Sequence, residues 1–306
     1  MNITGQISET SSSDSKTFLS EGARNMLLAT FFFGLMNVFV KQLENIPAME
    51  IVFFRCLVSL VACWFGLRSK KVDWLGNNRL LLTLRGTFGT LALFTFFLTI
   101  QNIPLASAVT LQYLSPIFTT AIAVFFLNEK IRPLHWLFYL ISFAGVFFIK
   151  GFNSDFPLIF LFTGIVSAIC SGAAYNLVRS LKGQEHPLVI VLHFQLVGIV
   201  VGFLFTVFQW TTPVGIEWIY LLATGILTQL GQVHLTKALQ AEQVAKVSIL
   251  NYTGIFYALF FGWFLFGEIY NLQTVAGILL VVAGVVMSIL YSRRRTNVEE
   301  LEITKT

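Results

Sequence analysis

Ten long apolar segments, separated by short polar ones, dominate this sequence. Each is about 20 residues long, the length that an α-helix needs to cross a hydrocarbon core of about 30 Å. Their apolar residues occupy every helical face, whereas the strands of a membrane barrel would alternate apolar and polar residues. We therefore expect helices at Asn25–Leu43, Pro47–Leu67, Leu80–Ile100, Leu105–Leu127, Pro133–Lys150, Pro157–Ser180, Pro187–Gln209, Gly215–Leu239, Val244–Phe266 and Leu272–Tyr291.

The composition agrees with an integral membrane protein. Hydrophobic residues make up 56% of the chain and charged residues only 11%, against about a quarter charged in soluble domains. The Ser/Thr-rich residues 1–23 have no basic start and no cleavage-type ending, so we expect a disordered cytosolic tail there rather than a signal peptide. Residues 292–306 are expected to form a basic cytosolic tail. The three cysteines all fall inside predicted spans and show neither a disulfide framework nor metal-type spacing.

Basic residues are distributed unevenly between the two sides that this topology creates. With the N-terminus inside, the inner segments hold sixteen of the 20 Lys and Arg residues, and the outer ones hold only Lys41 and Lys150. The remaining two, Arg55 and Arg85, fall within spans. Because basic flanks are retained in the cytoplasm, we expect a multi-pass protein of the inner (plasma) membrane with both termini cytoplasmic. The net charge of +5 then reflects topology, and no nucleic-acid partner is indicated.

From Gly86 onward the chain repeats itself at an offset of 139 residues without a gap, and upstream the offset is 138 or 140. The offset pairs Gly86 with Gly225, Gln101 with Gln240, Tyr113 with Tyr252, Glu129 with Glu268, and Ala144-Gly145-Val146 with Ala283-Gly284-Val285. Residues 24–150 and 157–291 are therefore two copies of a five-helix unit. Five is odd, so the second copy enters the membrane from the opposite side. The expected fold is an all-α integral membrane protein of ten transmembrane helices in two inverted five-helix repeats, which is transporter architecture.

Several motifs resemble a known family. They are IPAMEIVFFR at 46–55, the LRG at 84–86, PLASAVTLQYLSPIFTTAIAVFFLNEKI at 104–131 with its echo FGEI at 266–269, and GQVHLTKALQ at 231–240. The chain resembles the EamA type of the drug/metabolite transporter superfamily over nearly its whole length after residue 24. The resemblance implies a central cavity lined by the first, third, fourth, sixth, eighth and ninth helices, with the fifth and tenth outside. It does not fix a substrate.

Polar residues inside the spans are the candidates for a solute site, because an unpartnered polar group in hydrocarbon is costly. On the cavity-type helices they are Asn37, Arg85, Gln112, Tyr113, Tyr175, Asn176, Gln229, Gln232, His234, Asn251 and Tyr252. Each could instead bond a neighbouring helix. Arg85 could pair with a carboxylate or phosphate, or extend back to the inner headgroups. Arg55 is expected to be a structural tie to backbone carbonyls, and His193 a packing residue.

Three residues are candidates for gating. Glu129 and Glu268 each end the fourth helix of a repeat, where a charge could serve as a gate contact or simply end the helix at the headgroups. Pro116 lies in mid-span and should kink its helix, either for gating or as a static bend. The spacing of Gly198 and Gly202 suits a homodimer interface or packing within the chain.

The sequence favours a secondary transporter that moves a small solute across the lipid bilayer by alternating access. A cavity with arginine and amides but no carboxylate favours an amino acid or a related carboxylate, moved by export. It also favours facilitated movement or exchange over proton coupling. Uptake and drug efflux remain alternatives, as do a membrane-embedded enzyme and a non-transporting scaffold. No catalytic motif, nucleotide-binding loop, metal site or cofactor site is predicted.

Overall fold

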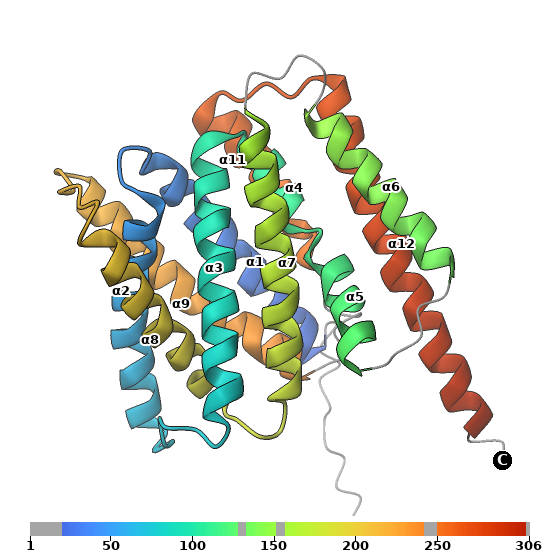
Figure 1. The fold of residues 1–306 in the computed structure, drawn as a ribbon, viewed down its shortest axis with the longest axis horizontal. Helices are drawn as coiled ribbons and strands as arrows, with labels where there is room; N and C mark the ends of the chain where they lie inside the picture. Colours follow the sequence, from blue (N-terminus) through green and yellow to red (C-terminus); the bar gives the residue numbers. More distant parts are fainter. Residues whose placement is uncertain (1–19, 128–132, 151–156, 242–249, 304–306) are drawn as a thin grey trace, which may run out of the picture.

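Helices make up the described parts of the chain. The computed structural model describes residues 20–127, 133–150, 157–241 and 250–303, and Figure 1 shows their helices standing side by side along one direction. The helices are α1 (Glu21–Gln42), α2 (Ala48–Ser69), α3 (Arg79–Asn102), α4 (Leu105–Gln112), α5 (Ser115–Leu127), α6 (Pro133–Lys150), α7 (Leu158–Ser180), α8 (Pro187–Thr206), α9 (Glu217–Ala241), α11 (Thr253–Phe266) and α12 (Leu272–Ile303).

Most of these helices have the length and hydropathy of membrane spans. Among the described residues, seven segments are long and apolar enough to cross a bilayer, with mean hydropathies from 1.3 to 2.6, and α6 and α11 are shorter apolar helices. The outer surface of the bundle is apolar, with Phe147 74% and Phe208 85% exposed. Such side chains are stable where they face lipid. The prediction of an all-α integral membrane fold of ten spans is confirmed, with α4 and α5 together forming one span.

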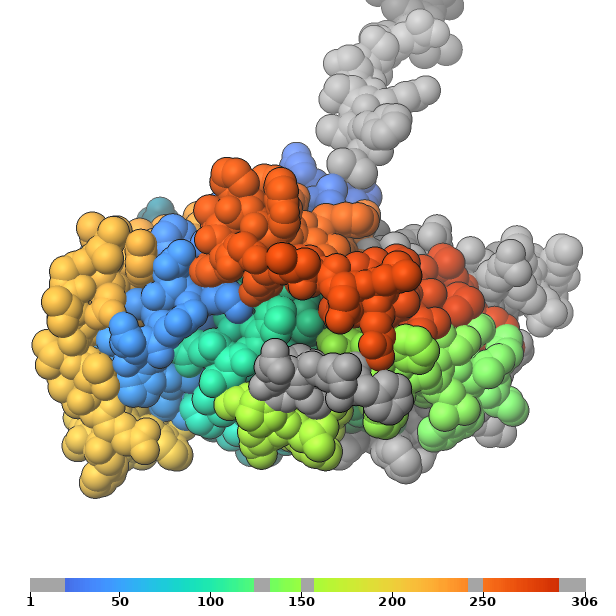
Figure 2. Space-filling view, turned by 90° about the horizontal axis from the view of Figure 1, so that it is seen from above, coloured from blue at the N-terminus to red at the C-terminus, as the bar shows by residue number. Residues whose placement is uncertain are grey.

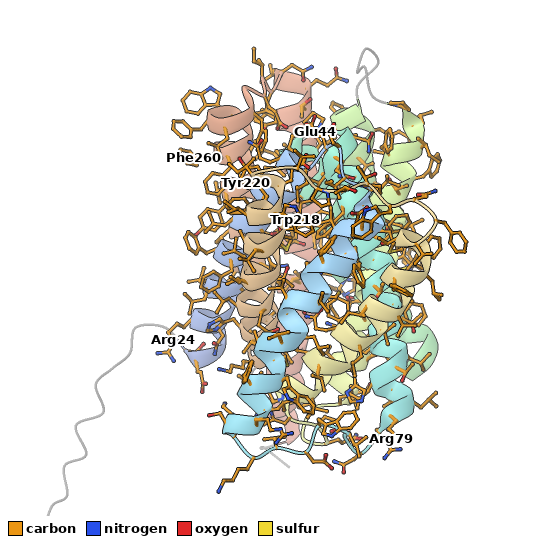
Figure 3. The ribbon with its side chains drawn as sticks, turned by 90° about the vertical axis from the view of Figure 1, so that its left-hand side faces the viewer. Arg24, Glu44, Arg79, Trp218, Tyr220 and Phe260 are labelled. Atoms are coloured by element: carbon orange, nitrogen blue, oxygen red, sulfur yellow. The ribbon has the colours of Figure 1, made fainter. Side chains whose placement is uncertain are left out.

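The two ends of the bundle differ in charge. Figure 3 shows Arg24 and Arg79 at one end, called here the basic end, and Glu44 at the opposite end, called the Glu44 end. Trp218 and Tyr220 lie toward the Glu44 end, where aromatic rings commonly meet the headgroups. At the basic end the Glu185 carboxylate accepts the backbone N–H groups of Asn77 and Asn78, at 2.5 and 2.7 Å. This contact fastens the loop before α8 to the start of α3.

The packing follows the inverted repeat. Exchanging the two halves replaces α1 by α7 and α9 by α3, and both α1 with α9 and α3 with α7 are major packing pairs. The pairs α2 with α8 and α6 with α12 each join a helix to its own repeat counterpart, and α4 packs on α11, the counterpart of α5. In Figure 1 the α6–α12 pair lies at one edge of the molecule. The first five spans therefore interlock with the second five.

Glycines allow these helices to approach closely. A side chain on Gly86 would lie 2.6 Å from Val197 of α8, and one on its repeat counterpart Gly225 would lie 2.5 Å from Val58 of α2. Gly198 and Gly202 face α2, where a side chain on Gly202 would lie 2.9 Å from Phe53. Small residues stabilise such contacts by letting backbones meet. Gly198 and Gly202 are thus used within the chain and give no support to a homodimer.

The fourth span is broken, contrary to the continuous helix predicted for Leu105–Leu127. The α4 helix ends at Gln112 and α5 begins at Ser115, two residues apart. Pro116 has no N–H to donate to the Gln112 carbonyl, which explains the break. In the second half, α11 begins at Thr253 directly after Tyr252, the repeat counterpart of Tyr113. Both halves therefore interrupt this span at the same tyrosine.

Two further expectations concern helix ends. The last span was expected to end at Tyr291, whereas α12 continues to Ile303. Residues 292–303 contain no Gly or Pro that would end a helix, so the helix extends into the predicted basic tail. Glu129 lies outside the described residues.

Candidate functional site

A cavity lies at the centre of the bundle. It has a volume of about 110 Å³ and is bordered by residues of α1, α2, α3, α4, α7, α8 and α9, together with Asn251. Its polar border consists of Asn37, Arg55, Arg85, Gln112, Tyr113, Ser171, Tyr175, Gln232 and Asn251. Seven of the eleven predicted solute-site residues are therefore brought together here. No Asp or Glu borders the cavity among the described residues.

Arg85 extends toward the middle of the bundle. It begins seven residues into α3, counted from Arg79 at the basic end, and a side chain on Gly89, one turn farther along, would collide with its guanidinium. Its Nη2 donates to Gln232 Oε1 at 3.2 Å, and its guanidinium carbon lies 4.4 Å from the centre of the Phe194 ring. The alternative of an arginine extending back to the headgroups is therefore wrong. Its positive charge faces the cavity, and its hydrogen bond and ring contact are with neutral groups.

Gln112 is held by two serines of α7. Its Oε1 accepts from Ser167 Oγ and its Nε2 donates to Ser171 Oγ, both at 2.6 Å. These two contacts hold the amide in place against α7. Asn251, the repeat counterpart of Gln112, borders the same cavity from the second half. The two halves thus contribute amides at equivalent positions.

The tyrosine pair joins the two broken spans. Tyr252 donates its hydroxyl to the backbone carbonyl of Tyr113 at 2.9 Å, and the two ring centres are 5.2 Å apart. The carbonyl is available because Ile117 N–H bonds Leu114 instead of Tyr113. Tyr113 borders the cavity, whereas Tyr252 lies behind it. The break in the first half is therefore stabilised by the second half.

Four predicted solute-site residues do not border the cavity. Besides Tyr252, they are Asn176, Gln229 and His234. Asn176 donates to the Thr119 carbonyl at 2.9 Å and so joins α7 to α5. His234 bonds Asn25 at 2.7 Å between α9 and α1, and Gln229 is buried. Asn176 and His234 follow the alternative of bonding a neighbouring helix.

Two residues that sequence reasoning set aside do border the cavity. Ser171 was not among the predicted solute-site residues, and Arg55 was expected to bond backbone carbonyls, yet both line it. Instead the Arg55 guanidinium contacts the side chains of Thr228, Gln195 and Cys56. A charge in mid-span was a usable signal for Arg55. The resemblance had not included the second helix among those that line the cavity.

A polar cluster closes the Glu44 end, made of Lys41, Leu105, Glu268 and Tyr270. Lys41 Nζ lies 2.7 Å from Glu268 Oε1, and both side chains are only 11% exposed. The same carboxylate accepts the Leu105 backbone N–H at 2.9 Å and the Tyr270 hydroxyl at 2.5 Å. Figure 2, which looks onto this end, shows the orange segment around α11 lying beside the blue and teal segments of the first half. Burial, followed by the hydrogen bond to Glu268, raises the pKa of Tyr270, so its hydroxyl stays a donor.

The titratable side chains do not form a metal centre. No group of three or more His, Cys, Asp or Glu residues that could hold a metal ion occurs in the described part of the chain. The chemistry that the central cavity offers is therefore recognition by guanidinium, amide and phenol groups. An anion would find donors there, because guanidinium binds carboxylate and phosphate with paired hydrogen bonds.

Comparison with known proteins gives consistent results. Residues 21–151 and 158–290 each match the model of the EamA-like transporter family. The chain is 32% identical over 274 residues to the pseudopaline exporter CntI of Pseudomonas aeruginosa, covering 88% of this chain and 96% of that protein. It is 29% identical over 276 residues to solute carrier family 35 member G1 of Homo sapiens, covering 84% of this chain and 76% of that protein. A solved crystal structure matches with a TM-score of 0.67 at 16% identity, over 89% of this chain and 98% of that one, and so shares the fold.

Proposed function

This chain belongs to the EamA-like transporter family, and from that premise we propose that it exports a small anionic solute through its central cavity by alternating access. The family and the named relatives are transporters, so the protein is a membrane transporter and not an enzyme. The proposal concerns which solute is carried, in which direction and how. An amino acid or a related carboxylate is the solute class we favour.

The observation that carries the proposal is Arg85. It is 3% exposed, borders the cavity and has an uncharged hydrogen-bond partner in Gln232. Burying a charge without a counter-charge is costly, and a carboxylate or phosphate of the solute would supply one. A lipophilic cation would instead be repelled in a space of low dielectric constant. Gln112, Tyr113 and Asn251 would then orient the remainder of the solute.

Alternating access is supported by the way the two halves meet. Inverted repeats provide two similar bundles that can rock about a central site, and broken helices at mid-membrane are common at such sites. Here both fourth spans break beside the cavity, at Tyr113 and Tyr252. We propose that the ion pair of Lys41 and Glu268 acts as the gate contact at the Glu44 end. It joins α1, the start of α4 and the α11–α12 loop, and opening this end would require it to separate.

The proposed direction of solute movement rests on the charge of the basic end and on the name of one relative. The basic end carries the predicted cytoplasmic loops, which agrees with a cytoplasmic location for both termini in the inner (plasma) membrane. The relative at 32% identity is named an exporter, which favours movement from the basic end to the Glu44 end. Because no carboxylate borders the cavity among the described residues, we favour facilitated movement or exchange over proton coupling.

Counterflow in proteoliposomes tests the proposal. Radiolabelled amino acids, organic acids and a cationic dye would be compared in wild type, Arg85→Gln and Arg79→Gln. Arg79 begins the same helix and is exposed at the basic end, so its substitution is the matched control. We expect uptake of an acid that falls about 10-fold or more in Arg85→Gln, the loss of one charge-assisted contact, and little change in Arg79→Gln. Uptake of the dye but of no acid, unaltered by Arg85→Gln, would refute the anionic site.

A further inference from the structure

Arg55 is a second buried guanidinium at the same cavity. It lies in the middle of α2, is 0% exposed, and borders the cavity together with Arg85. An arginine in this position is fully removed from water and from the headgroups. Arginine keeps its proton under almost all conditions, so the interior of the bundle holds a second positive charge.

The neighbours of Arg55 do not neutralise it. Its Nη1 lies 3.4 Å from Thr228 Oγ1, and its Nη2 lies 3.5 Å from Gln195 Oε1. These are long for hydrogen bonds from a charged donor, which are usually about 2.7–2.9 Å. Its Nε has no partner. The structure therefore leaves donor capacity on this guanidinium unused.

No acidic side chain compensates Arg55 in the described part of the chain. The ion pair found there is Lys41 with Glu268, at the Glu44 end. Glu50 lies on the same helix, five residues toward that end, and one of its oxygens accepts the Thr211 N–H at 3.0 Å. It forms no ion pair with Arg55. A buried cation with neutral partners needs an anion from outside the chain.

Phe194 holds the two guanidiniums near one another. Its ring centre lies 5.1 Å from the guanidinium carbon of Arg55 and 4.4 Å from that of Arg85. The two carbons are thus no farther apart than the sum of these distances. An aromatic face partly stabilises a cation, but one ring cannot neutralise two. The site therefore holds two positive charges, both in contact with the Phe194 ring.

We propose that Arg55 is a second anion-binding residue and that the solute carries two separated anionic groups, one for each guanidinium. The inference rests on the proposed function, in which Arg85 binds one such group. It narrows the solute class from monocarboxylates such as simple amino acids to dicarboxylates and related compounds. Arg55, interpreted from sequence as a structural tie, then determines specificity.

Wild-type selectivity is the first test. Counterflow of succinate and longer linear dicarboxylates would be compared with that of butyrate and longer monocarboxylates, and with inorganic phosphate. We expect dicarboxylates of one length range to be carried at least about 10-fold faster than monocarboxylates of equal length, the effect of one further charged contact. Equal rates for the two classes would overturn the inference and leave the proposed function standing. Phosphate carried faster than every dicarboxylate would also overturn it, since a single group would then suffice.

Substitutions at Arg55 are the second test. Arg55→Gln should lower the ratio of dicarboxylate to monocarboxylate flux about 10-fold or more, and Arg55→Lys should retain part of the preference. Arg68→Gln is the control, because Arg68 lies on the same helix, is exposed and packs on Trp64. A variant that loses both classes equally, at normal membrane abundance, would contradict a role in specificity. If Arg55→Gln does not reach the membrane, the wild-type selectivity decides alone. If the wild type carries none of the acids and Arg85→Gln does not change any measured flux, the proposed function itself is refuted.

Discussion

Lys41 and Arg85 are both buried cations on helices of the first repeat, yet their surroundings differ. Lys41 at the Glu44 end has a carboxylate at 2.7 Å and a backbone carbonyl, that of Ile103, at 2.9 Å. Arg85 in the central cavity has the amide of Gln232 and the ring of Phe194. Among the described residues, the buried cation at the Glu44 end, Lys41, thus has a carboxylate partner, whereas Arg85 at the centre has none.

The difference teaches how a membrane protein can keep a charge available. A buried ion pair satisfies itself and holds helices together, whereas an unpaired cation stays costly until an anion arrives. Neutral partners lower that cost in part, through hydrogen bonds and ring contacts. We infer that the Glu44 end is built for closure and the cavity for binding. The predictions below test this division.

The largest effect is expected from giving the cavity its own carboxylate. Gln232→Glu would place an anion about 3 Å from Arg85 without changing side-chain size, as judged from the present 3.2 Å contact. A pair at this distance is worth about 5 kcal/mol at an effective dielectric constant of 20, so anion flux should fall by about 100-fold or more. Counterflow in proteoliposomes measures this. Gln209→Glu, at an exposed position after α8, is the control that keeps the added charge out of the cavity.

The second change does the opposite and removes the carboxylate partner of Lys41 at the Glu44 end. Glu268→Gln should lower stability by about 3 kcal/mol, because it leaves Lys41 buried with no counter-charge. In the double variant Lys41→Met/Glu268→Gln the loss should be clearly smaller than the two single losses combined. Thermal unfolding of the purified protein measures both. Additive losses would show that the two side chains are not coupled, and unchanged transport in Glu268→Gln would exclude its role as a gate.

The tyrosine pair compares the two repeats directly. Tyr252→Phe removes the donor to the Tyr113 carbonyl and should cost about 1 kcal/mol, the typical net value of such a bond. Tyr113→Phe should cost less, because among the described residues the Tyr113 hydroxyl makes no hydrogen bond. Melting temperatures of the two variants measure the difference. Equal shifts would mean that the hydroxyl of Tyr252 does not stabilise the broken span.

The fold could be predicted from sequence because its signals are long. Spans of about 20 apolar residues leave few alternatives in lipid, and a nearly constant offset defines the repeat. The break at Tyr113 was partly predictable, since Pro116 removes a hydrogen bond. The break at Tyr252 was not, because no proline follows it and its geometry depends on packing against the first half.

The site was harder to predict for a geometric reason. A polar residue in mid-span is visible in the sequence, but a small rotation of its helix decides whether it faces a cavity or a neighbour. Gln229 and Gln232 lie three residues apart on one face of α9, yet Gln232 borders the cavity and Gln229 does not. Arg55 was interpreted as a structural tie because the second helix was not among the expected lining helices, although a charge within a span is itself a sign of a functional site.

The smallest effect on stability is expected at the basic end, because water screens the charges there. His186 precedes α8 and its Nδ1 accepts the Leu188 N–H at 3.1 Å, which caps the helix. Burial, then the charges of Lys70 and Lys237, lower the pKa of His186 below its usual value of 6.5. The unfolded chain therefore binds the proton first, so this contribution to stability is complete above about pH 6.5 and is lost as the pH falls through the lowered pKa. His186 is partly exposed, and solvent screening keeps the effect below about 1 kcal/mol. Melting temperatures of wild type and His186→Asn between about pH 8 and pH 5.5 isolate it, because asparagine keeps a cap without titrating. We expect the wild type to lose slightly more stability than the variant on acidification, and parallel curves would show that this charged end does not couple to folding.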